Sequence, residues 1–457
     1  MNIKDKNILI VGNARSGMGA ARLAISQGAK VSIYDNKSYE KWDALMQNEI
    51  NAMRENGITF YLGEEVASDE FEILIVSPGV PLEIAIIQEA KTKNIEIIGE
   101  LEFASRFCDA PIIAITGTNG KTTTTTLVGE ILRGHNPDTY VVGNIGRAFS
   151  EDVRLIPKTG VVVAEVSSFQ LETIQSFHPQ VSALLNITPD HLNRHHTMEN
   201  YCETKYKLFE NQKDEDFCVL NPRDFYFKEA KAKAHCTCIE FSLTHVPQRG
   251  AYVVQEKIFE NINGKENYIC DVAELKIKGT HNIENALAAV AITVTFGVPL
   301  PIIRNGLITF KGVEHRTEYV TTKKGVDFFN DSKATNTDAA IAGIVGLSVL
   351  NKPIRLIAGG MDKHTSFKDW IKLFHGIVKE VYIIGETKEQ ILRECKEAEY
   401  TSVQAFDTFE EAIIAAYKES NPGECILLSP ACASWDMFES YEQRGDLFKE
   451  IANRLEG

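Results

Sequence analysis

The sequence predicts an α/β protein of three domains, and three observations support this prediction. The chain has 457 residues, which at roughly 100–200 residues per domain corresponds to about three domains. Short apolar runs alternate with segments of helical pattern along most of the chain, as in parallel sheets built from βαβ units. Many of these runs end in glycine or polar residues, and in open α/β sheets ligands bind at the carboxyl ends of the strands.

The first domain is expected to span residues 1–99 and to be Rossmann-like. The segment 17–29 predicts a helix with an alanine-rich face. The predicted strands are apolar runs that end in turn residues, at 7–12, 30–35, 72–79 and 95–100.

The second domain is expected to span residues 100–312. Its predicted strands lie at 111–117, 160–167 and 181–188, and short strands, which could pair antiparallel, are expected between 213 and 278. The segment 280–297 predicts a helix, with Thr280 or Asn282 as its cap and Gly297 as its stop signal.

The third domain is expected to span residues 313–457, again as alternating strands and helices. Its predicted strands are 326–332, 354–360, 380–386 and 425–431. Polar clusters follow these strands: "FFNDSKATN" (328–336), "GGMDKHT" (359–365) and "LSPACASWDMFESYEQRG" (428–445). Polar clusters that gather on one edge of a sheet predict a binding site there.

Composition favours an enzyme of the cytoplasm with no membrane span. The chain is 44% hydrophobic and 24% charged, and no apolar run reaches the ~18 residues that a membrane helix requires. Its beginning lacks the apolar core of a signal peptide. The net charge of −15, without a basic block, argues against nucleic-acid binding. Anionic ligands would therefore require helix N-termini, a few lysines and bound cations.

The cysteines indicate no disulfide framework. They number nine, an odd count, and are scattered along the chain. The run "HCTC" (His235, Cys236, Cys238) could bind a metal, but no second Cys/His pair follows at zinc-finger spacing.

The run "ITGTNGKTT" (115–123) has two interpretations. It could be a low-complexity stretch, or a loop that wraps nucleotide phosphates with backbone N–H groups. An apolar strand precedes it and a plausible helix follows, which favours the phosphate loop. Gly117 lies only three residues before Gly120, so the usual spacing of such loops is not met. The threonines after Lys121 are expected to fill the first turns of the helix.

The run "VGNARSG" (11–17) resembles the dinucleotide-binding turn but lacks its second glycine. Ala14 stands where that glycine would let a pyrophosphate approach the backbone, and Asp35 ends the next strand, where an acidic residue often meets a ribose. We interpret this turn as a site for the nucleotide part of a substrate rather than for NAD.

Several residues of the second domain could hold a cation. Glu165 ends an apolar strand, where a carboxylate must be solvated, paired or bound to a metal, and Mg²⁺ is the natural partner near phosphates. His191 is either a further ligand or a surface histidine. His195, four residues on, suggests a zinc pair that no H-E-x-x-H pattern supports. From charge alone, Lys205 is a solvated helix lysine.

Together these runs resemble the Mur ligase family of peptidoglycan synthesis. The resemblance covers essentially the whole chain in order and spacing, and the specific runs are "EVSSFQLE", "NITPDHLNRH", "THNIENALAA", "HRTE", "NDSKATN" and "SPACASWDMFESYEQRG". "GTNGKT" is shared with all members and with folylpolyglutamate synthases. "SSFQLE", "NDSKATN" and "SPACAS" are similar to the member that adds D-glutamate.

The resemblance implies a UDP-binding first domain, a central P-loop ATPase domain and a third, Rossmann-like domain that binds ATP and the amino acid. It also implies a reaction. ATP phosphorylates the carboxylate of UDP-N-acetylmuramoyl-L-alanine, and the amine of D-glutamate then displaces the phosphate. The implied cofactors are ATP and Mg²⁺ at two sites. A monomer is expected.

The resemblance also carries over site residues. The implied ATP set is Gly117, Thr118, Asn119, Gly120, Lys121, Thr122, Thr123, Asn282, Asn285, His315, Arg316 and Asp331. The implied UDP-substrate set is Arg15, Ser16, Asp35, Asn36, Lys37, Ser77, Pro78, Gly79 and Asn144. The implied D-glutamate set is Lys333, Thr335, Lys363, Ser434 and Tyr441.

The implied catalytic residues are Lys121, Glu165, His191 and Lys205. Thr122 and Glu165 would bind one Mg²⁺, and His191 and Lys205 would face the second, with Lys205 carbamylated as in the family. That implication reverses the interpretation of Lys205 from its charge alone. Lys37 and Tyr441 stand where some members have arginine and phenylalanine.

Two alternatives remain. One is a related ligase that takes another amino acid, including a folylpolyglutamate-type enzyme. The other is a nucleotide switch that hydrolyses ATP without ligation, although a third domain with polar clusters is not expected in a switch.

Overall fold

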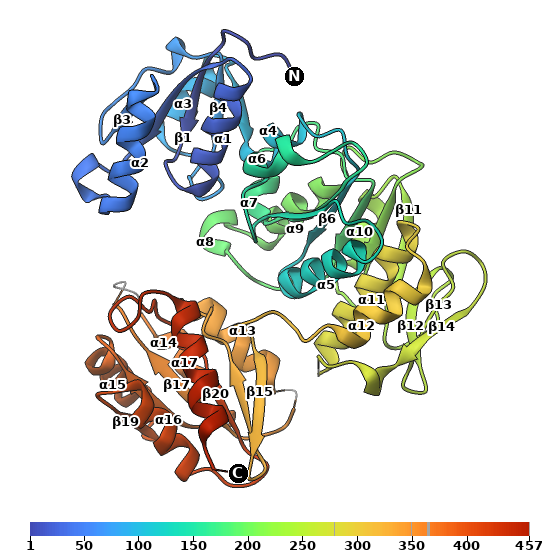
Figure 1. The fold of residues 1–457 in the computed structure, drawn as a ribbon, viewed down its shortest axis with the longest axis vertical. Coiled ribbons are helices and arrows are strands. Elements are labelled where there is room, and N and C mark those ends of the chain that lie inside the picture. The colour runs from blue at the N-terminus through green and yellow to red at the C-terminus, as the bar shows by residue number, and fades with distance from the viewer. Residues whose placement is uncertain (278, 349, 363–365, 457) are drawn as a thin grey trace. The chain divides into compact units, whose positions relative to one another are not determined.

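The computed structural model describes residues 1–277, 279–348, 350–362 and 366–456, and the strands of this part form three sheets (Figure 1). The chain divides into two compact units, which are described separately. The first comprises Met1–Lys276 and Asn282–Phe310, and the second comprises Ile277–His281 and Lys311–Gly457.

The first sheet has the order β3-β2-β1-β4-β5, with every pair of neighbours parallel. Helices cover both faces, so the central strands are apolar along their length: Ile8 and Ile73 lie side by side, fully buried. Its elements are β1 (Asn7–Val11), α1 (Arg15–Ser26), β2 (Lys30–Asp35), α2 (Ala44–Glu55), β3 (Thr59–Leu62), β4 (Ile73–Val76), α3 (Ala85–Thr92) and β5 (Glu96–Gly99).

The second sheet has the order β14-β13-β12-β11-β10-β9-β6-β8-β7. Its strands are β6 (Ile112–Thr116), β7 (Thr139–Gly143), β8 (Val161–Glu165), β9 (Val181–Leu184), β10 (Phe217–Leu220), β11 (Thr237–Ser242), β12 (Gly250–Val254), β13 (Lys257–Glu260) and β14 (Asn267–Asp271). Its helices are α4 (Glu100–Ser105), α5 (Lys121–Arg133), α6 (Phe149–Asp152), α7 (Ser168–Leu171), α8 (Leu192–His195), α9 (Met198–Tyr206), α10 (Phe227–Lys233), α11 (Thr280–Thr295) and α12 (Leu300–Thr309).

The first two sheets share one hydrophobic core. Helix α1 packs closely on α6: a Cβ added at Gly19 would lie 2.7 Å from Oγ of Ser150. One continuous cluster of buried side chains runs from Ile10 and Leu23 to Phe149 and Val162. This packing places the two sheets within one compact unit.

The region 213–278 is partly different from the prediction. Only β13 is antiparallel to its neighbours, β12 and β14, whereas β10, β11 and β12 continue the parallel sheet from β9. Because α10 connects β10 with β11, this pair is a further βαβ unit.

The third sheet has the order β15-β16-β20-β17-β18-β19, and only β15 is antiparallel to its neighbour. Trp370 and Phe374 belong to the core on one face, and Phe328 and Phe448 to the core on the other. Its elements are β15 (Glu318–Lys323), β16 (Val326–Asn330), α13 (Thr337–Ser348), β17 (Ile354–Gly359), α14 (Lys368–Lys372), β18 (Val378–Ile384), α15 (Lys388–Glu397), β19 (Val403–Ala405), α16 (Phe409–Lys418), β20 (Cys425–Leu428) and α17 (Tyr441–Arg454).

The predicted three-domain α/β fold is confirmed, and the strands predicted by residue range all form. Strands β3, β7, β15 and β19 were not predicted. β15 is a half-exposed edge strand and β19 has three residues, so neither carries a long apolar run. The domain boundaries at 99 and 312 stay a prediction.

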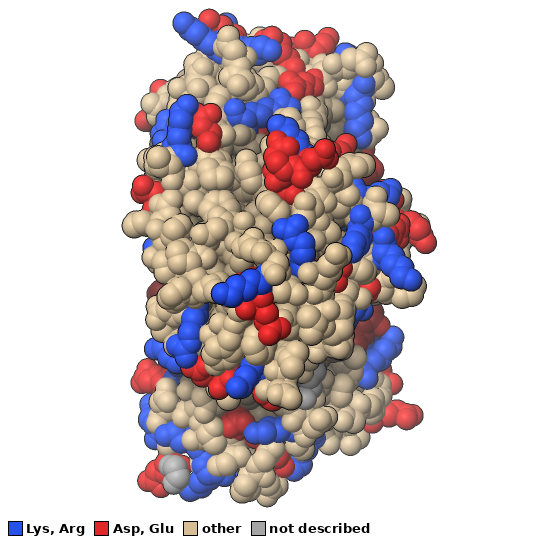
Figure 2. Space-filling model, turned by 90° about the vertical axis from the view of Figure 1, so that its right-hand side faces the viewer, with Lys and Arg blue, Asp and Glu red and all other residues tan. Residues whose placement is uncertain are grey.

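The surface carries charges of both signs. On the face drawn in Figure 2, Lys and Arg side chains are interspersed with Asp and Glu, and broad uncharged areas lie between them. Among the described helices, none combines the length and apolar character needed to cross a bilayer. The cysteines are free thiols, so no disulfide framework forms in the described part of the chain.

Candidate active site

The glycine-rich run forms a loop between β6 and α5, in the strand–loop–helix context that a phosphate loop requires. Gly120 has a left-handed φ of 82°, and a Cβ there would lie 2.3 Å from Oδ1 of Asn285, so only glycine fits. Lys121 turns back over the loop, where its Nζ donates to the carbonyls of Gly117 (2.9 Å) and Thr118 (2.7 Å). The first turn of α5 thus presents backbone N–H groups beside a lysine ammonium.

A second loop holds the phosphate loop in place. Asn186, after β9, accepts from the backbone N–H of Thr118 through its carbonyl (2.9 Å) and from that of Asn119 through its side chain (2.8 Å). It also donates to the carbonyl of Asn119. On the other side, Oγ1 of Thr124 donates to the amide of Asn285, which in turn donates to Asn282. The predicted residues Asn282 and Asn285 therefore lie beside this loop.

Thr122, Thr124 and Thr125 are buried in α5, as predicted for threonines that fill its first turns.

Glu165 ends β8, the strand next to β6, and its carboxylate is only partly satisfied. The residue is 1% exposed, and its Oε1 accepts from the side chain of Asn144 at 2.8 Å. Its Oε2 is buried and has no hydrogen-bond partner in the described residues. A buried carboxylate oxygen without a donor is costly unless a cation or proton meets it. The donor chemistry therefore fits Mg²⁺, whose preferred ligands are oxygens.

Lys205 is buried in α9, and the interpretation of it as a solvated lysine is wrong. It is 1% exposed, and its Nζ donates to the carbonyl of Gly117 at 2.9 Å, with the ring of Tyr201 4.7 Å away. Burial, reinforced by the charge of Lys121, holds the pKa of Lys205 well below its usual range. Its amine thus lies at the phosphate loop in an environment that favours the uncharged form.

His191 and His195 differ in their surroundings. His191 precedes α8 with a left-handed φ of 53°, and its Nε2 lies 3.5 Å from Asp190. His195 is buried against Oγ of Ser168 at 2.9 Å, and burial lowers its pKa. Among the described residues, no group of three or more His, Cys, Asp or Glu is placed to hold a metal.

The predicted UDP-substrate residues lie at the carboxyl edge of the first sheet, except Asn144, which follows β7 of the second sheet. Asp35 accepts from the backbone N–H groups of Asn13 (2.8 Å) and Lys37 (2.9 Å), which ties β1 and β2 together. Ser77 donates to the carbonyl of Gly12 at 3.1 Å, which adds the end of β4. Nζ of Lys37 lies 4.1 Å from the Trp42 ring. Arg15 and Asn36 are exposed beside them, with Ser16 half-buried.

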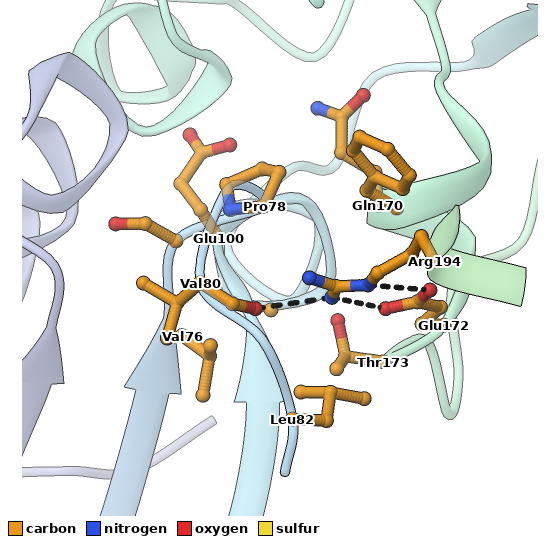
Figure 3. Close-up of a pocket in the computed structure, with 12 residues that line it drawn as sticks. Val76, Pro78, Val80, Leu82, Glu100, Gln170, Glu172, Thr173 and Arg194 are labelled. Atoms are coloured by element: carbon orange, nitrogen blue, oxygen red, sulfur yellow. Dashed lines mark hydrogen bonds and ion pairs between the residues drawn. The ribbon is translucent and has the colours of Figure 1, made fainter. Parts of the chain in front are cut away.

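A pocket lies next to this edge, between the end of β4 and helices α7 and α8 (Figure 3). Ser77 and Pro78 line it from the first sheet, and Gln170 and Arg194 line it from the second. Glu100 lines it as well; its Oε1 accepts from the backbone N–H of Ser150 at 2.7 Å, and burial raises its pKa. The predicted substrate residues thus border a hollow shared by two sheets of one unit.

In the second unit, Asp331 is buried at the end of β16. It accepts from Oγ of Ser429 (2.8 Å) and from the backbone N–H of Thr317 (3.1 Å). Burial raises the pKa of Asp331 to about 6, although these hydrogen bonds and the charge of Arg316 oppose the shift.

Two further predicted residues, Lys333 and His315, lie beside Tyr441, which begins α17. Nζ of Lys333 lies 5.7 Å from the centre of the Tyr441 ring, and the ring of His315 is 6.0 Å away, edge to face. The backbone N–H of Lys333 donates to the carbonyl of His315 at 3.0 Å. Ser434 is buried in the loop before α17. Thr335 is half-buried after Lys333, and Lys363 lies outside the described residues.

Arg444, which the sequence did not single out, connects the polar clusters of the third sheet. It is fully buried in α17, and its guanidinium donates to Ser332 (Oγ 3.0 Å, carbonyl 2.8 Å) and to the carbonyls of Cys432 and Ala433 (3.2 and 3.4 Å). All these acceptors are neutral, and burial lowers its pKa to about 10. Helical spacing places Arg444 on the buried face of Phe448 and Ile451, a signal that the sequence does contain.

Asn13 is another residue that the sequence did not single out. It is fully buried in the first glycine turn, and both polar atoms of its side chain lack a hydrogen-bond partner in the described structure. The burial of Asn13 was not predicted, because the run 11–17 was interpreted from the positions of its glycines alone.

The fold and the site define a class of protein: a three-domain α/β protein with a glycine-rich loop between a strand and a helix of its second sheet. Models of the family match in the same order. They are the Mur ligase MurD-like N-terminal domain at residues 6–99, the Mur ligase middle domain at 115–293, and the Mur ligase glutamate ligase domain at 315–432. The chain belongs to the Mur ligase family.

Curated relatives align over the full length. The UDP-N-acetylmuramoylalanine--D-glutamate ligase of Alkaliphilus oremlandii is 44% identical, with all of both chains covered. The proteins of the same name from Lachnoclostridium phytofermentans and Clostridioides difficile are 43% and 42% identical, covering all of this chain and 99% and 100% of theirs.

Solved structures share the fold. The UDP-N-acetylmuramate-alanine ligase MurC of Thermotoga maritima has a TM-score of 0.55 at 19% identity, covering 98% of this chain and 99% of that one. MurF of Acinetobacter baumannii has a TM-score of 0.56 at 16% identity, covering 98% and 93%.

Proposed function

We propose that this protein is an ATP-dependent ligase that joins D-glutamate to UDP-N-acetylmuramoyl-L-alanine in peptidoglycan precursor synthesis. The observation that carries the proposal is the full-length similarity, at 42–44% identity, to relatives named for that reaction. The phosphate loop beside the buried, half-satisfied Glu165 supports it.

The chemistry explains why such a ligase needs ATP. A carboxylate is a poor electrophile, so one of its oxygens first attacks the γ-phosphorus of ATP, forming an acyl phosphate and releasing ADP. The amine nitrogen of D-glutamate then attacks the acyl carbon, loses a proton, and expels inorganic phosphate as the amide forms. Positioning and charge stabilisation supply most of the rate in phosphoryl transfer.

The ATP phosphates are assigned to the loop and first turn of α5, residues 117–123. Lys121 supplies a positive charge there, and its ammonium already lies over the loop carbonyls. Asn282 and Asn285 belong to the same nucleotide site, and His315, Arg316 and Asp331 are assigned to it from the third domain.

Mg²⁺ is proposed at two sites. Thr122 and Glu165 would hold one ion, which the unpartnered Oε2 of Glu165 supports. His191 and a carbamylated Lys205 would hold the other. Bound Mg²⁺ would neutralise phosphate charge while the two anionic reactants approach. The lysine can become a carbamate because its uncharged amine adds to CO₂ with loss of one proton, and burial favours that uncharged form.

The remaining assignments follow the chemistry of the ligands. Lys333, Thr335, Lys363, Ser434 and Tyr441 suit the two carboxylates of D-glutamate, because ammonium and hydroxyl groups donate to them. Asn144 and the residues at the edge of the first sheet are assigned to the UDP-substrate. Domain boundaries at 99 and 312 and a cytoplasmic site of action stay expectations. We also expect a monomer, and light scattering tests that oligomeric state.

Mass spectrometry of the product tests the proposed function. With ATP, Mg²⁺ and UDP-N-acetylmuramoyl-L-alanine, D-glutamate should give a product heavier by one glutamate less one water. L-glutamate, lysine or diaminopimelate should give none. When the substrate carboxylate carries ¹⁸O, one label should appear in the released phosphate. A product with another amino acid, or unlabelled phosphate, would contradict the assignment.

A further inference from the structure

Arg194 occupies the pocket between the first and second sheets, although the proposed mechanism gives it no role. It lies in α8, and its side chain is 13% exposed. Figure 3 shows its guanidinium reaching from the second sheet toward the loop that follows β4.

The guanidinium is held on both sides of the pocket. Toward its own sheet, Nε and Nη2 form a two-point contact with the carboxylate of Glu172, at 3.1 and 2.5 Å. Toward the first sheet, Nη2 donates to the carbonyl of Val80 at 3.0 Å. The ring of Phe169 lies 5.1 Å from the guanidinium carbon. This geometry uses the planar fork of arginine, which a lysine cannot reproduce.

The contact with Val80 fixes a loop that the proposed function places at the UDP-substrate. Val80 directly follows Ser77, Pro78 and Gly79, and Ser77 is itself bonded to the glycine turn of β1. On the other side, α8 starts immediately after His191. Arg194 thus connects the substrate loop of the first sheet to the loop that carries a proposed metal ligand.

A more extensive set of hydrogen bonds connects the two sheets elsewhere, so Arg194 is not needed merely to hold them together. The buried carboxylate of Glu102 in α4 accepts from the backbone N–H groups of residues 175, 176 and 177 at 2.8–3.0 Å. It also binds Arg106 at 2.7 Å. Arg106 also binds Glu96 of β5 at 2.6 Å, and the side chain of Gln175 donates to the carbonyl of Ile97 in β5 at 3.1 Å, so this cluster joins the same two sheets. None of these residues lines the pocket.

We propose that Arg194 is a positioning residue that sets the geometry of the loop 77–80 against α7 and α8, and thereby the binding of the UDP-substrate. The inference rests on the proposed function. Because Arg194 would align the substrate rather than take part in the chemical step, its loss should change KM for the UDP-substrate and leave KM for ATP nearly unchanged.

Steady-state kinetics of Arg194→Met and Arg194→Lys test this role, with the thermal midpoint of each variant measured alongside. For Arg194→Met, KM for UDP-N-acetylmuramoyl-L-alanine should rise at least roughly tenfold, the effect of losing one hydrogen bond to a charged group. KM for ATP should change less than about twofold, and Arg194→Lys should recover part of the loss.

Glu102→Gln is the matched control for a purely structural role. It should lower the thermal midpoint more than Arg194→Met does, with KM for the UDP-substrate unchanged. The inference is overturned if Arg194→Met leaves that KM unchanged, or if it raises the KM values of ATP and the UDP-substrate alike. Wild-type protein is assayed in parallel, so that absence of D-glutamate ligation there refutes the proposed function and not the role of Arg194 alone.

Discussion

The amine of Lys205 lies in surroundings that disfavour its charge. Its partners are the carbonyl of Gly117, the hydroxyl of Thr116 and the ring of Tyr201. Among nearby charges, the ammonium of Lys121 has the largest effect on its pKa, and it lowers that pKa further. An uncharged amine is the form that reacts with CO₂, so the environment itself favours the carbamate.

We expect Lys205→Ala to lose activity by a factor on the order of 10²–10³, the usual cost of removing one electrostatic group from an active site. Added short carboxylates such as acetate or propionate should restore part of it, because they can replace the carbamate in the cavity. Carbon-13 labelling with CO₂ should give a carbamate signal in the wild type that the variant lacks. Full activity of the variant would remove the carbamate from the account.

Asp331 should make the stability of the protein depend on pH. Burial raises its pKa from 3.8 to about 6, so between these values the folded state binds more protons than the unfolded state. The free energy of unfolding should therefore fall as pH rises from 3.8 to 6, by on the order of 3 kcal/mol at most.

Asp331→Asn should remove that component of the pH dependence. Chemical unfolding of both proteins between pH 4 and 7 measures it. Curves of the two proteins that stay parallel over the range would show that Asp331 does not titrate as the structure indicates.

At the scale of elements, the turn between β6 and α5 depends on one glycine. Gly120 has a left-handed φ of 82°, and a Cβ there would meet Asn285 at 2.3 Å. Gly57 has a similar φ of 85°, but nothing lies within 4 Å of its added Cβ. An alanine at Gly57 would therefore add backbone strain alone, whereas an alanine at Gly120 would add both backbone strain and steric overlap.

Gly57→Ala should cost about 1 kcal/mol of stability, the strain of a left-handed alanine, and leave ATP binding unchanged. Gly120→Ala should cost more stability and weaken ATP binding, because Asn285 must also move away from the loop. Calorimetric titration with a non-hydrolysable ATP analogue measures the affinity. Equal effects of the two substitutions would contradict the proposed geometry of the loop.

The two buried arginines of the third sheet lie at different ends of its strands. Arg444 joins the polar loops after β16 and β20, whereas Arg355, near the start of β17, is paired with Glu424 and Glu380 at 2.7 and 2.9 Å. Both residues are at most 3% exposed.

Arg444→Met should raise KM for D-glutamate by roughly tenfold or more, because the loops that carry Ser434 and Lys333 lose their common donor. Arg355→Met should lower the thermal midpoint instead, because the buried Glu424 and the half-buried Glu380 lose the guanidinium that they share, and should leave that KM unchanged. If both variants lowered the thermal midpoint and left KM for D-glutamate unchanged, the proposed role of Arg444 in the D-glutamate site would be contradicted.

Many of the strands and helices could be predicted from local sequence patterns. Apolar runs such as 111–117 and 354–360 predict buried parallel strands, because a strand covered on both faces is apolar throughout. Edge strands such as β15 are half-exposed, so hydrophobic periodicity does not reveal them. The strand–loop–helix arrangement of β6 and α5 was predictable because its glycines, lysine and flanking elements are contiguous in sequence.

Other parts of the site depend on contacts distant in sequence. The burial of Lys205 depends on Gly117, 88 positions away, and charge alone gave the wrong environment. Arg444 reaches Ser332 across 112 positions. Arg194 reaches Val80 across 114 positions, and nothing in either segment predicts the contact.

At the scale of the whole molecule, the strand ends of the sheets bear the proposed nucleotide, substrate and amino-acid residues. The net charge of −15 is opposite to what anionic ligands prefer, so attraction must come from Lys121, Lys333, helix N-termini and bound cations. Substrate binding should therefore depend on Mg²⁺ more than on the overall field of the protein.

Phosphate release from ATP and Mg²⁺, measured in a panel that omits one component at a time, tests the D-glutamate ligation most directly. We expect release only when UDP-N-acetylmuramoyl-L-alanine and D-glutamate are both present, and we expect Glu165→Gln to lose it. Release that continues without either cosubstrate would contradict ligation and leave only an ATPase.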